Sequence, residues 1–120
     1  MRSVKLTLKG IPPSLNTFAG RENSWEYRKA KQNWTNTVLW TLKAQGIRLP
    51  KPFERARVTI LYYFPDNRRH DPDNYSGKLF TDGLTRGGII VDDDFKHICL
   101  SVDGDVDRAY PRTEIVVQEL

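Results

Sequence analysis

Residues 56–64 read Ala-Arg-Val-Thr-Ile-Leu-Tyr-Tyr-Phe, and this stretch decides the fold because β-branched and aromatic residues dominate it. Such a composition favours a β-strand in the centre of a sheet. A second strand is predicted over 4–8, where Val4, Leu6 and Leu8 alternate with polar residues. That alternation is typical of a strand with one buried face.

A long helix is predicted over about 24–45. Asn23 is placed to cap its start, with Glu26 reaching back, and Gly46 is placed to end it. The apolar face is predicted from residues that recur at steps of three and four: Tyr27, Ala30, Trp34, Val38, Leu42 and Gln45. The steps match the helical repeat, so one side of this helix is expected to face the core.

The second half of the chain predicts one more helix and several strands. The helix is expected over about 74–85, packing Tyr75, Leu79 and Leu84 and ending at Gly87-Gly88. Strands are expected at residues 89–91, 97–102 and 113–120, with a turn at 103–105. We therefore predict one α+β domain over 1–120, a mixed β-sheet with two helices packed against it.

Composition excludes several classes of protein. The 120 residues hold one cysteine, Cys99, so no internal disulfide can form, and this suits a reducing cytoplasm. No apolar run approaches the ~20 residues of a membrane helix, and no His/Cys grouping suits structural zinc. A membrane protein, a secreted disulfide scaffold and a zinc module are therefore not expected.

The net charge of +4 divides unevenly along the chain. Residues 1–70 hold 14 Lys and Arg against 4 Asp and Glu, whereas residues 71–120 hold 5 against 11. A basic half attracts a polyanion, and an acidic half can hold a divalent cation. The alternative is a chance segregation of solvated charges.

Residues 68–74, Arg-Arg-His-Asp-Pro-Asp-Asn, carry the densest chemistry. Pro72 pushes Asp71 towards an extended backbone, and residues two apart in an extended chain project to one side. Asp71 and Asp73 can then share a cation such as Mg²⁺, with a third carboxylate from the run Asp92–Asp94.

Other interpretations of these acidic residues stay open. Asp71 followed by Pro72 is also a good helix start, with Asp71 as the cap. The run Asp92–Asp94 taken alone is usual for a solvated surface.

Several groups of residues carry a family resemblance: Pro12-Pro13-Ser14-Leu15-Asn16, Asp71-Pro72-Asp73-Asn74, Lys78, Asp82-Gly83-Leu84, Gly88 and Val91-Asp92-Asp93. Together they resemble the RusA family of Holliday-junction resolvases over most of the chain. The resemblance implies three aspartates that bind magnesium (Mn²⁺ as an alternative ion) and a nearby lysine needed for cleavage.

Carried over by position, the aspartates are Asp71, Asp73 and Asp93, with Asp94 as the alternative third ligand. In the family, the lysine is expected three residues after the position of Asn74, but this sequence has Gly77 there. Lys78 follows one place later, which we interpret as a one-residue insertion near Ser76-Gly77. The lysine is therefore assigned to Lys78. If this stretch is helical, Lys78 can instead form a surface pair with Asp82.

DNA contact is predicted for basic residues of the first 70 positions: Arg21, Arg28, Lys29, Lys31, Arg68 and Arg69. Such contacts to phosphate give affinity without sequence preference. Trp25 and Phe18 lie among these charges and are candidates to stack on unpaired bases, whereas Tyr27 is assigned to the core. His70 and His97 are expected to be ordinary polar residues.

We therefore expect a magnesium-dependent endonuclease that resolves four-way DNA junctions, in the cytoplasm of a bacterium or encoded by a phage. Paired nicks require two sites, so a twofold homodimer is expected, as the resemblance also implies. Two alternatives remain: a branched-DNA-binding module without cleavage, and a metal-binding interaction protein with no role on DNA.

Overall fold

The computed structural model describes residues 2–18 and 24–120. Within these ranges the chain forms four strands, two α-helices and two short 3₁₀ helices. In chain order the elements are β1 (Ser3–Lys9), η1 (Leu15–Phe18), α1 (Trp25–Ala44), β2 (Ala56–Phe64), η2 (Pro72–Asn74), α2 (Thr81–Arg86), β3 (Ile98–Val106) and β4 (Arg112–Glu119).

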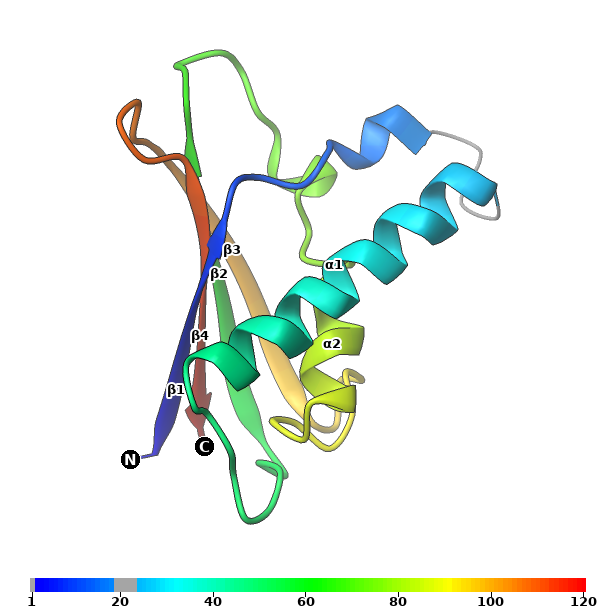
Figure 1. Ribbon diagram of the computed structural model, residues 1–120, viewed down its shortest axis with the longest axis vertical. Coiled ribbons are helices and arrows are strands. Elements are labelled where there is room, and N and C mark those ends of the chain that lie inside the picture. Colours follow the sequence, from blue (N-terminus) through cyan, green and yellow to red (C-terminus); the bar gives the residue numbers. More distant parts are fainter. Residues whose placement is uncertain (1, 19–23) are drawn as a thin grey trace.

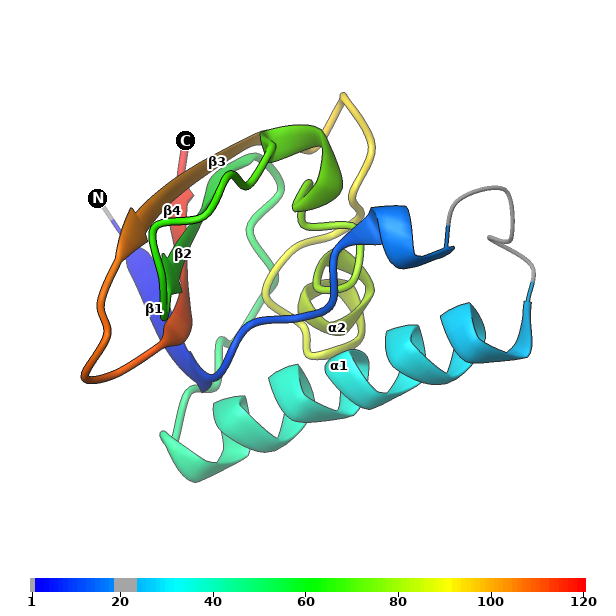
Figure 2. The same cartoon turned by 90° about the horizontal axis from the view of Figure 1, so that it is seen from above.

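The strands form one sheet in the order β1-β4-β2-β3. Strand β4 is antiparallel to both β1 and β2, whereas β2 and β3 are parallel, so the sheet is mixed. Both helices lie on the same side of the sheet (Figures 1 and 2). The predicted α+β domain with a mixed sheet and two packed helices is confirmed.

Strand β2 supplies the centre of the core. Its alternate residues from Ala56 to Phe64 are buried, and the residues between them face the other side of the sheet. The buried side packs in one cluster with Val38 and Leu42 of α1 and Leu84 of α2. The prediction of a central strand over 56–64 is confirmed at both ends.

Helix α1 begins one residue later than predicted. Ser24 is its N-cap, and its hydroxyl accepts a hydrogen bond of 3.2 Å from the Tyr27 backbone N–H. The predicted cap, Asn23, lies outside the described residues. At the other end Gly46 has φ +68°, and the Ile47 N–H reaches the Leu42 carbonyl at 2.9 Å. This hydrogen bond, which spans six residues, is typical of a helix C-terminus that ends in a left-handed glycine. The prediction that Gly46 ends the helix is confirmed.

The second helix is shorter than predicted, because the chain from 74 to 80 is not α-helical. Helix α2 spans only Thr81–Arg86. Gly77 has φ +89°, a left-handed conformation that interrupts an α-helix. Tyr75, Leu79 and Leu84 nevertheless pack inward as expected.

Two further predictions are wrong, the turn at 103–105 and the strand at 89–91. Residues 103–105 are not a turn: they lie inside β3, paired with residues 61–63 of the parallel strand β2. The carboxylates of Asp103 and Asp105 accept hydrogen bonds of 2.8 Å from the backbone N–H groups of Gly104 and Val106. Residues 89–91 form no strand, only an isolated bridge between Ile90 and Phe53.

Neither described α-helix combines the length and the apolarity needed to cross a membrane.

We expect Gly77→Ala to lower the free energy of unfolding by about 2–4 kcal/mol, because the strained φ and the clash add together. A Cβ at this position would lie 2.4 Å from Ile60 Cδ1. Gly46→Ala is the matched control, since Gly46 also has positive φ but has open space around it, and about 1 kcal/mol is expected. Chemical denaturation measures both variants, and equal losses would contradict the close approach to Ile60.

Candidate functional site

The Asp71-Pro72-Asp73 segment adopts the extended start that the sequence predicts. Asp71 has φ −99° and ψ 133°, and Pro72 opens the 3₁₀ helix η2. Although Asp71 occupies the cap position, its side chain makes no capping hydrogen bond. The capping interpretation is therefore wrong for the side chain, which is left available for other contacts.

The Asp73 carboxylate of this segment is exposed, whereas Asp71 is half-buried. Asp71 Oδ1 accepts a hydrogen bond of 3.0 Å from Arg69 Nε, and the Arg69 side chain is 87% exposed. An ion pair this exposed contributes little to the stability of the fold, and Arg69 can readily leave Asp71 for another partner. Asp73 is exposed and makes no hydrogen bond or ion pair with any residue that the structure describes. Neither carboxylate is thus committed to holding the fold.

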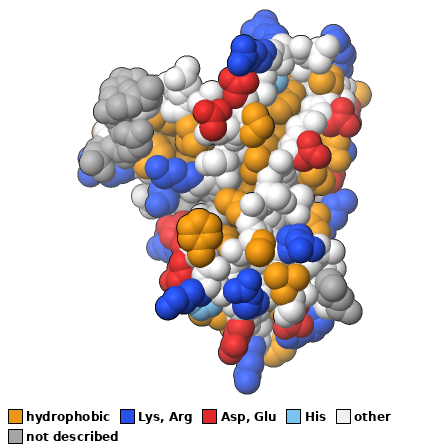
Figure 3. Space-filling view, turned by 180° about the vertical axis from the view of Figure 1, so that it is seen from behind, with side chains coloured by type: hydrophobic (Ala, Val, Ile, Leu, Met, Phe, Trp, Pro, Cys, Tyr) orange, Lys and Arg blue, Asp and Glu red, His pale blue; other side chains and the backbone are white. Residues whose placement is uncertain are grey.

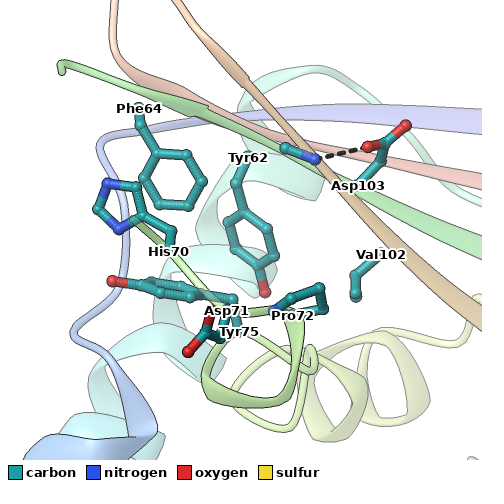
Figure 4. Close-up of a pocket in the computed structure, with 9 residues that line it drawn as sticks. Tyr62, Phe64, His70, Asp71, Pro72, Tyr75, Val102 and Asp103 are labelled. Carbon is teal, nitrogen blue, oxygen red and sulfur yellow. Dashed lines mark hydrogen bonds between the residues drawn. The ribbon is translucent and has the colours of Figure 1, made fainter. Parts of the chain in front are cut away.

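Aromatic packing anchors the segment to the sheet on both sides. The His70 ring stacks on Phe64, with ring centroids 3.8 Å apart and planes inclined by 4°. Tyr75 packs edge-on against Phe64 at 5.1 Å and against Tyr62 at 5.4 Å (Figure 4). Because residues before and after Asp71 and Asp73 are held this way, the backbone between them is fixed relative to β2.

His70 is further oriented by Asp66. The His70 Nε2 atom lies 3.3 Å from Asp66 Oδ1. The pKa of Asp66 is below its usual value, chiefly because the Arg68 backbone N–H donates to this carboxylate, with a smaller contribution from His70. His70 therefore acts as a packed polar residue, in agreement with the sequence prediction.

A pocket of about 90 Å³ lies between this segment and β3. Aromatic rings form its wall, and Asp71 and Asp103 lie at opposite ends of it (Figure 4). Sequence reasoning missed Asp103, since Asp-Gly-Asp has the composition of a turn. Only the pairing of β3 with β2 places Asp103 beside the pocket.

The run Asp92–Asp94 lies in the loop before β3. Asp92 Oδ1 accepts a hydrogen bond of 2.8 Å from the Asp93 N–H. Asp94 bonds the His97 ring and also the Lys96 N–H, and the His97 contact is the main reason that the pKa of Asp94 lies below its usual range. Asp93 has no partner among the described residues. Of the three, Asp93 is the carboxylate left free, which is the one the resemblance assigns.

The structure does not bring Asp93 to Asp71 and Asp73. The loop of Asp93 enters β3 at Ile98, whereas the pocket beside Asp71 is bordered by Val102. Four strand residues separate these points, about 13 Å, and the two regions lie at different heights in Figure 1. Within residues 2–18 and 24–120, no group of three or more His, Cys, Asp or Glu side chains can hold a metal ion.

Lys78 lies in the turn before α2 rather than on a helix. Its Nζ atom sits 5.3 Å from the centre of the Tyr27 ring, and no ion pair with Asp82 is present in the described part of the chain. The buried Gly77 beside it has no room for a side chain. Lys78 is thus an exposed cation of this turn, and its assignment by insertion stays a prediction.

The remaining predicted DNA-contact residues fall into two groups. Arg68 and Arg69 lie in the loop before η2, and Arg68 Nε is 3.7 Å from Asp66 Oδ2. Arg28 and Lys29 are exposed on α1 and Lys31 is half-buried, whereas Arg21 lies outside the described residues.

The two aromatic predictions beside this basic group have different outcomes. Phe18 is buried, packing edge-on against Tyr27 at 5.4 Å, so the prediction that it stacks on bases is wrong. Tyr27 is in the core as predicted. Trp25 is exposed, and Lys29 Nζ lies 4.8 Å from its ring centre.

No protein-family model matches the chain, and no curated protein matches it either. The roles proposed below for these residues therefore rest on geometry and on the motif itself.

We expect Asp71→Ala to change the free energy of unfolding by less than about 0.5 kcal/mol, since it removes only an exposed ion pair. Ser24→Ala is the matched control, because Ser24 does cap a helix, and a loss of about 1 kcal/mol is expected. Thermal and urea denaturation measure both. A larger loss for Asp71→Ala than for Ser24→Ala would restore a structural role for Asp71.

Proposed function

We propose that the chain is a magnesium-dependent endodeoxyribonuclease that resolves four-way DNA junctions by paired symmetric nicks. The observation that carries this proposal is the Asp71-Pro72-Asp73 segment. Its backbone is anchored by aromatic packing, while neither carboxylate stabilises the fold. Carboxylates that a fixed backbone holds in contact with water suit the binding of an ion better than the support of a fold. The proposed setting is the cytoplasm of a bacterium or of a phage-infected cell.

The donor chemistry of Asp71 and Asp73 fits Mg²⁺, with Mn²⁺ as the alternative. Magnesium is usually held by one or two carboxylates and several waters, and both side chains are open to water. Such an ion supplies polarisation of a phosphoryl oxygen and a more acidic bound water. Asp93 joins Asp71 and Asp73 in this proposal only if residues 92–95, between the tied ends of the loop, move towards η2.

The cations around the segment have distinct proposed roles. Lys78 is exposed, and the only interaction of its ammonium group among the described residues is a cation–π contact with the Tyr27 ring. Its ammonium group is therefore free to approach the negative charge that develops on the phosphate during cleavage. Arg68 and Arg69 are exposed on the loop that leads into the segment and are proposed to hold neighbouring phosphates. Arg69 would exchange its contact with Asp71 for phosphate when an ion occupies the carboxylates.

One observation favours a second candidate. Because the third carboxylate lies away from the other two, a module that binds branched DNA without cutting it also fits this arrangement. Exposed cations on α1 and on the loop before η2 would serve both functions. Cleavage in Mg²⁺ separates the two candidates.

A homodimer is part of the proposal, since symmetric nicks on a four-way junction require two sites related by a twofold axis. Strand β3 is the far edge of the sheet, and Leu100 and Val106 on it are 42% and 36% exposed. Figure 3, seen from behind the view of Figure 1, shows a strip of hydrophobic side chains on that side of the molecule. We propose that Leu100 and Val106 of β3 form the contact between the two copies.

We expect Asp73→Asn and Asp93→Asn to abolish junction cleavage in Mg²⁺ while binding of the junction is kept or strengthened, because each removes a negative charge that repels DNA. Glu54→Gln is the matched control, because Glu54 is an exposed carboxylate outside the proposed site and the proposed dimer contact, and this variant is expected to cleave normally. Cleavage of a labelled four-way junction and gel-shift binding are the measurements. Full activity of Asp93→Asn would refute closure of the loop, and full activity of Asp73→Asn would refute the site.

We expect Lys78→Ala to slow cleavage about 10²–10³-fold, about 3–4 kcal/mol, with little change in DNA binding, as for loss of a preorganised donor. Lys51→Ala controls for the loss of an exposed cation elsewhere. Single-turnover rates and binding constants are measured for both variants. An unchanged rate for Lys78→Ala would move this role to Arg68 or Arg69.

A further inference from the structure

The outward face of α1 carries a narrow stripe of exposed residues away from the Asp71-Pro72-Asp73 segment. At 100° per residue, the stripe lies within about 60° of Trp25 around the helix axis. Seven exposed residues lie in this sector, with the half-buried Leu39 among them: Trp25, Arg28, Lys29, Gln32, Asn36, Trp40 and Lys43. The buried residues of α1 lie on the opposite side of the helix.

The two tryptophans of this stripe are unusual in being open to water. Trp25 is 64% exposed and Trp40 is 67% exposed. A large aromatic side chain normally gains stability by burial, so two on one face mark an interaction surface. Trp34, on the inner side of the same helix, instead packs edge-on against Phe80 at 5.5 Å. The helix thus packs one tryptophan against the core, half-buried, and exposes the other two.

The residues between the tryptophans are cations and amides. Helix α1 contains a single acidic residue, Glu26, against Arg28, Lys29, Lys31 and Lys43. Lys29 Nζ lies over the Trp25 ring at 4.8 Å, which places a positive charge directly beside an aromatic face. A shallow hollow of about 440 Å³ runs from Trp25 to Asn36, lined by polar and basic side chains.

We propose that this stripe binds single-stranded DNA, with bases stacking on Trp25 and Trp40 and phosphates held by Lys29 and Lys43; the inference rests on the proposed action on DNA. Exposed aromatics joined by cations form the usual platform for unpaired strands. The two tryptophans are about 22 Å apart along the axis. That span suits a strand of about four nucleotides, at the low end of known site sizes.

The composition of the stripe favours this ligand over a lipid surface. A helix that lies on a membrane needs a continuous apolar face. Here Gln32 and Asn36 stand between the tryptophans, and amides can hydrogen-bond to base edges and phosphates.

The test uses the full chain in EDTA, so that no cleavage occurs. Tryptophan emission is followed while an oligothymidylate of about eight nucleotides is added. We expect saturable quenching and an affinity that falls as salt is raised. Anisotropy of the labelled oligonucleotide then compares variants, and Trp40→Ala and Trp25→Ala are each expected to weaken binding about 10-fold.

Phe95→Ala is the matched control, because Phe95 is an aromatic residue that is 99% exposed and lies outside α1. Its affinity for the oligonucleotide should equal that of the parent chain. A second pair compares charges: Lys29→Gln should reduce the salt dependence by about 0.7 in log–log slope, and Lys51→Gln should not. Circular dichroism confirms that each variant keeps the fold.

Three results would overturn the proposal: no quenching by the oligonucleotide, parent-like binding by both tryptophan variants, or an emission change with anionic phosphatidylserine vesicles alone. Junction cleavage in Mg²⁺ is measured in parallel. Cleavage by a chain that does not bind the single strand refutes this inference and leaves the proposed nuclease. Binding at the stripe by a chain that never cleaves refutes the nuclease and leaves this inference.

Discussion

The parallel pairing of β2 with β3 is the constraint on which the rest of the structure depends. Parallel neighbours need a long crossover connection, and here it runs from residue 65 to residue 97. The crossover must return across one face of the sheet, so it carries η2 and α2 to the side already covered by α1 (Figure 2). Every residue of the candidate site from Arg68 to Asp94 lies on this single connection, and its shape decides which of them meet.

The crossover is tied to the sheet at a few close contacts. Gly77 approaches Ile60 so closely that only a residue without Cβ fits, and Tyr62 and Phe64 hold His70 and Tyr75 by ring packing. These contacts all involve β2 and the first half of the crossover. The last part, from Val91 to His97, is tied to the start of β2 only at its ends: the Val91 N–H donates to the Phe53 carbonyl at 3.2 Å, and the Ala56 N–H donates to the His97 carbonyl at 2.9 Å. Between these ends, the hydrogen bonds of Asp92 and Asp94 are local. The difference explains why we propose movement for the loop of Asp93 and not for the segment of Asp71 and Asp73.

Negative and positive charges lie on different elements of the fold. The crossover and β3 hold most of the carboxylates, whereas α1 presents cations and two exposed tryptophans. Under the proposed function, the cations of α1 attract a polyanion, and the carboxylates of the crossover attract a divalent cation. Both can act together because α1 and the crossover lie on the same face of the sheet, with Lys78 of the crossover resting on Tyr27 of α1.

The sequence by itself determined the elements whose patterns are local. Alternation at Val4, Leu6 and Leu8, the β-branched run over 56–64 and the three-and-four steps of α1 each reflect one element burying one face, which neighbouring residues reveal. The extended start at Asp71 also followed from Pro72 alone. Tertiary structure decided the rest. The strand through Asp103, the shortened α2 and the separation of Asp93 from Asp73 depend on pairing with β2 and on contact with Ile60, and no local pattern encodes partners so distant in the chain.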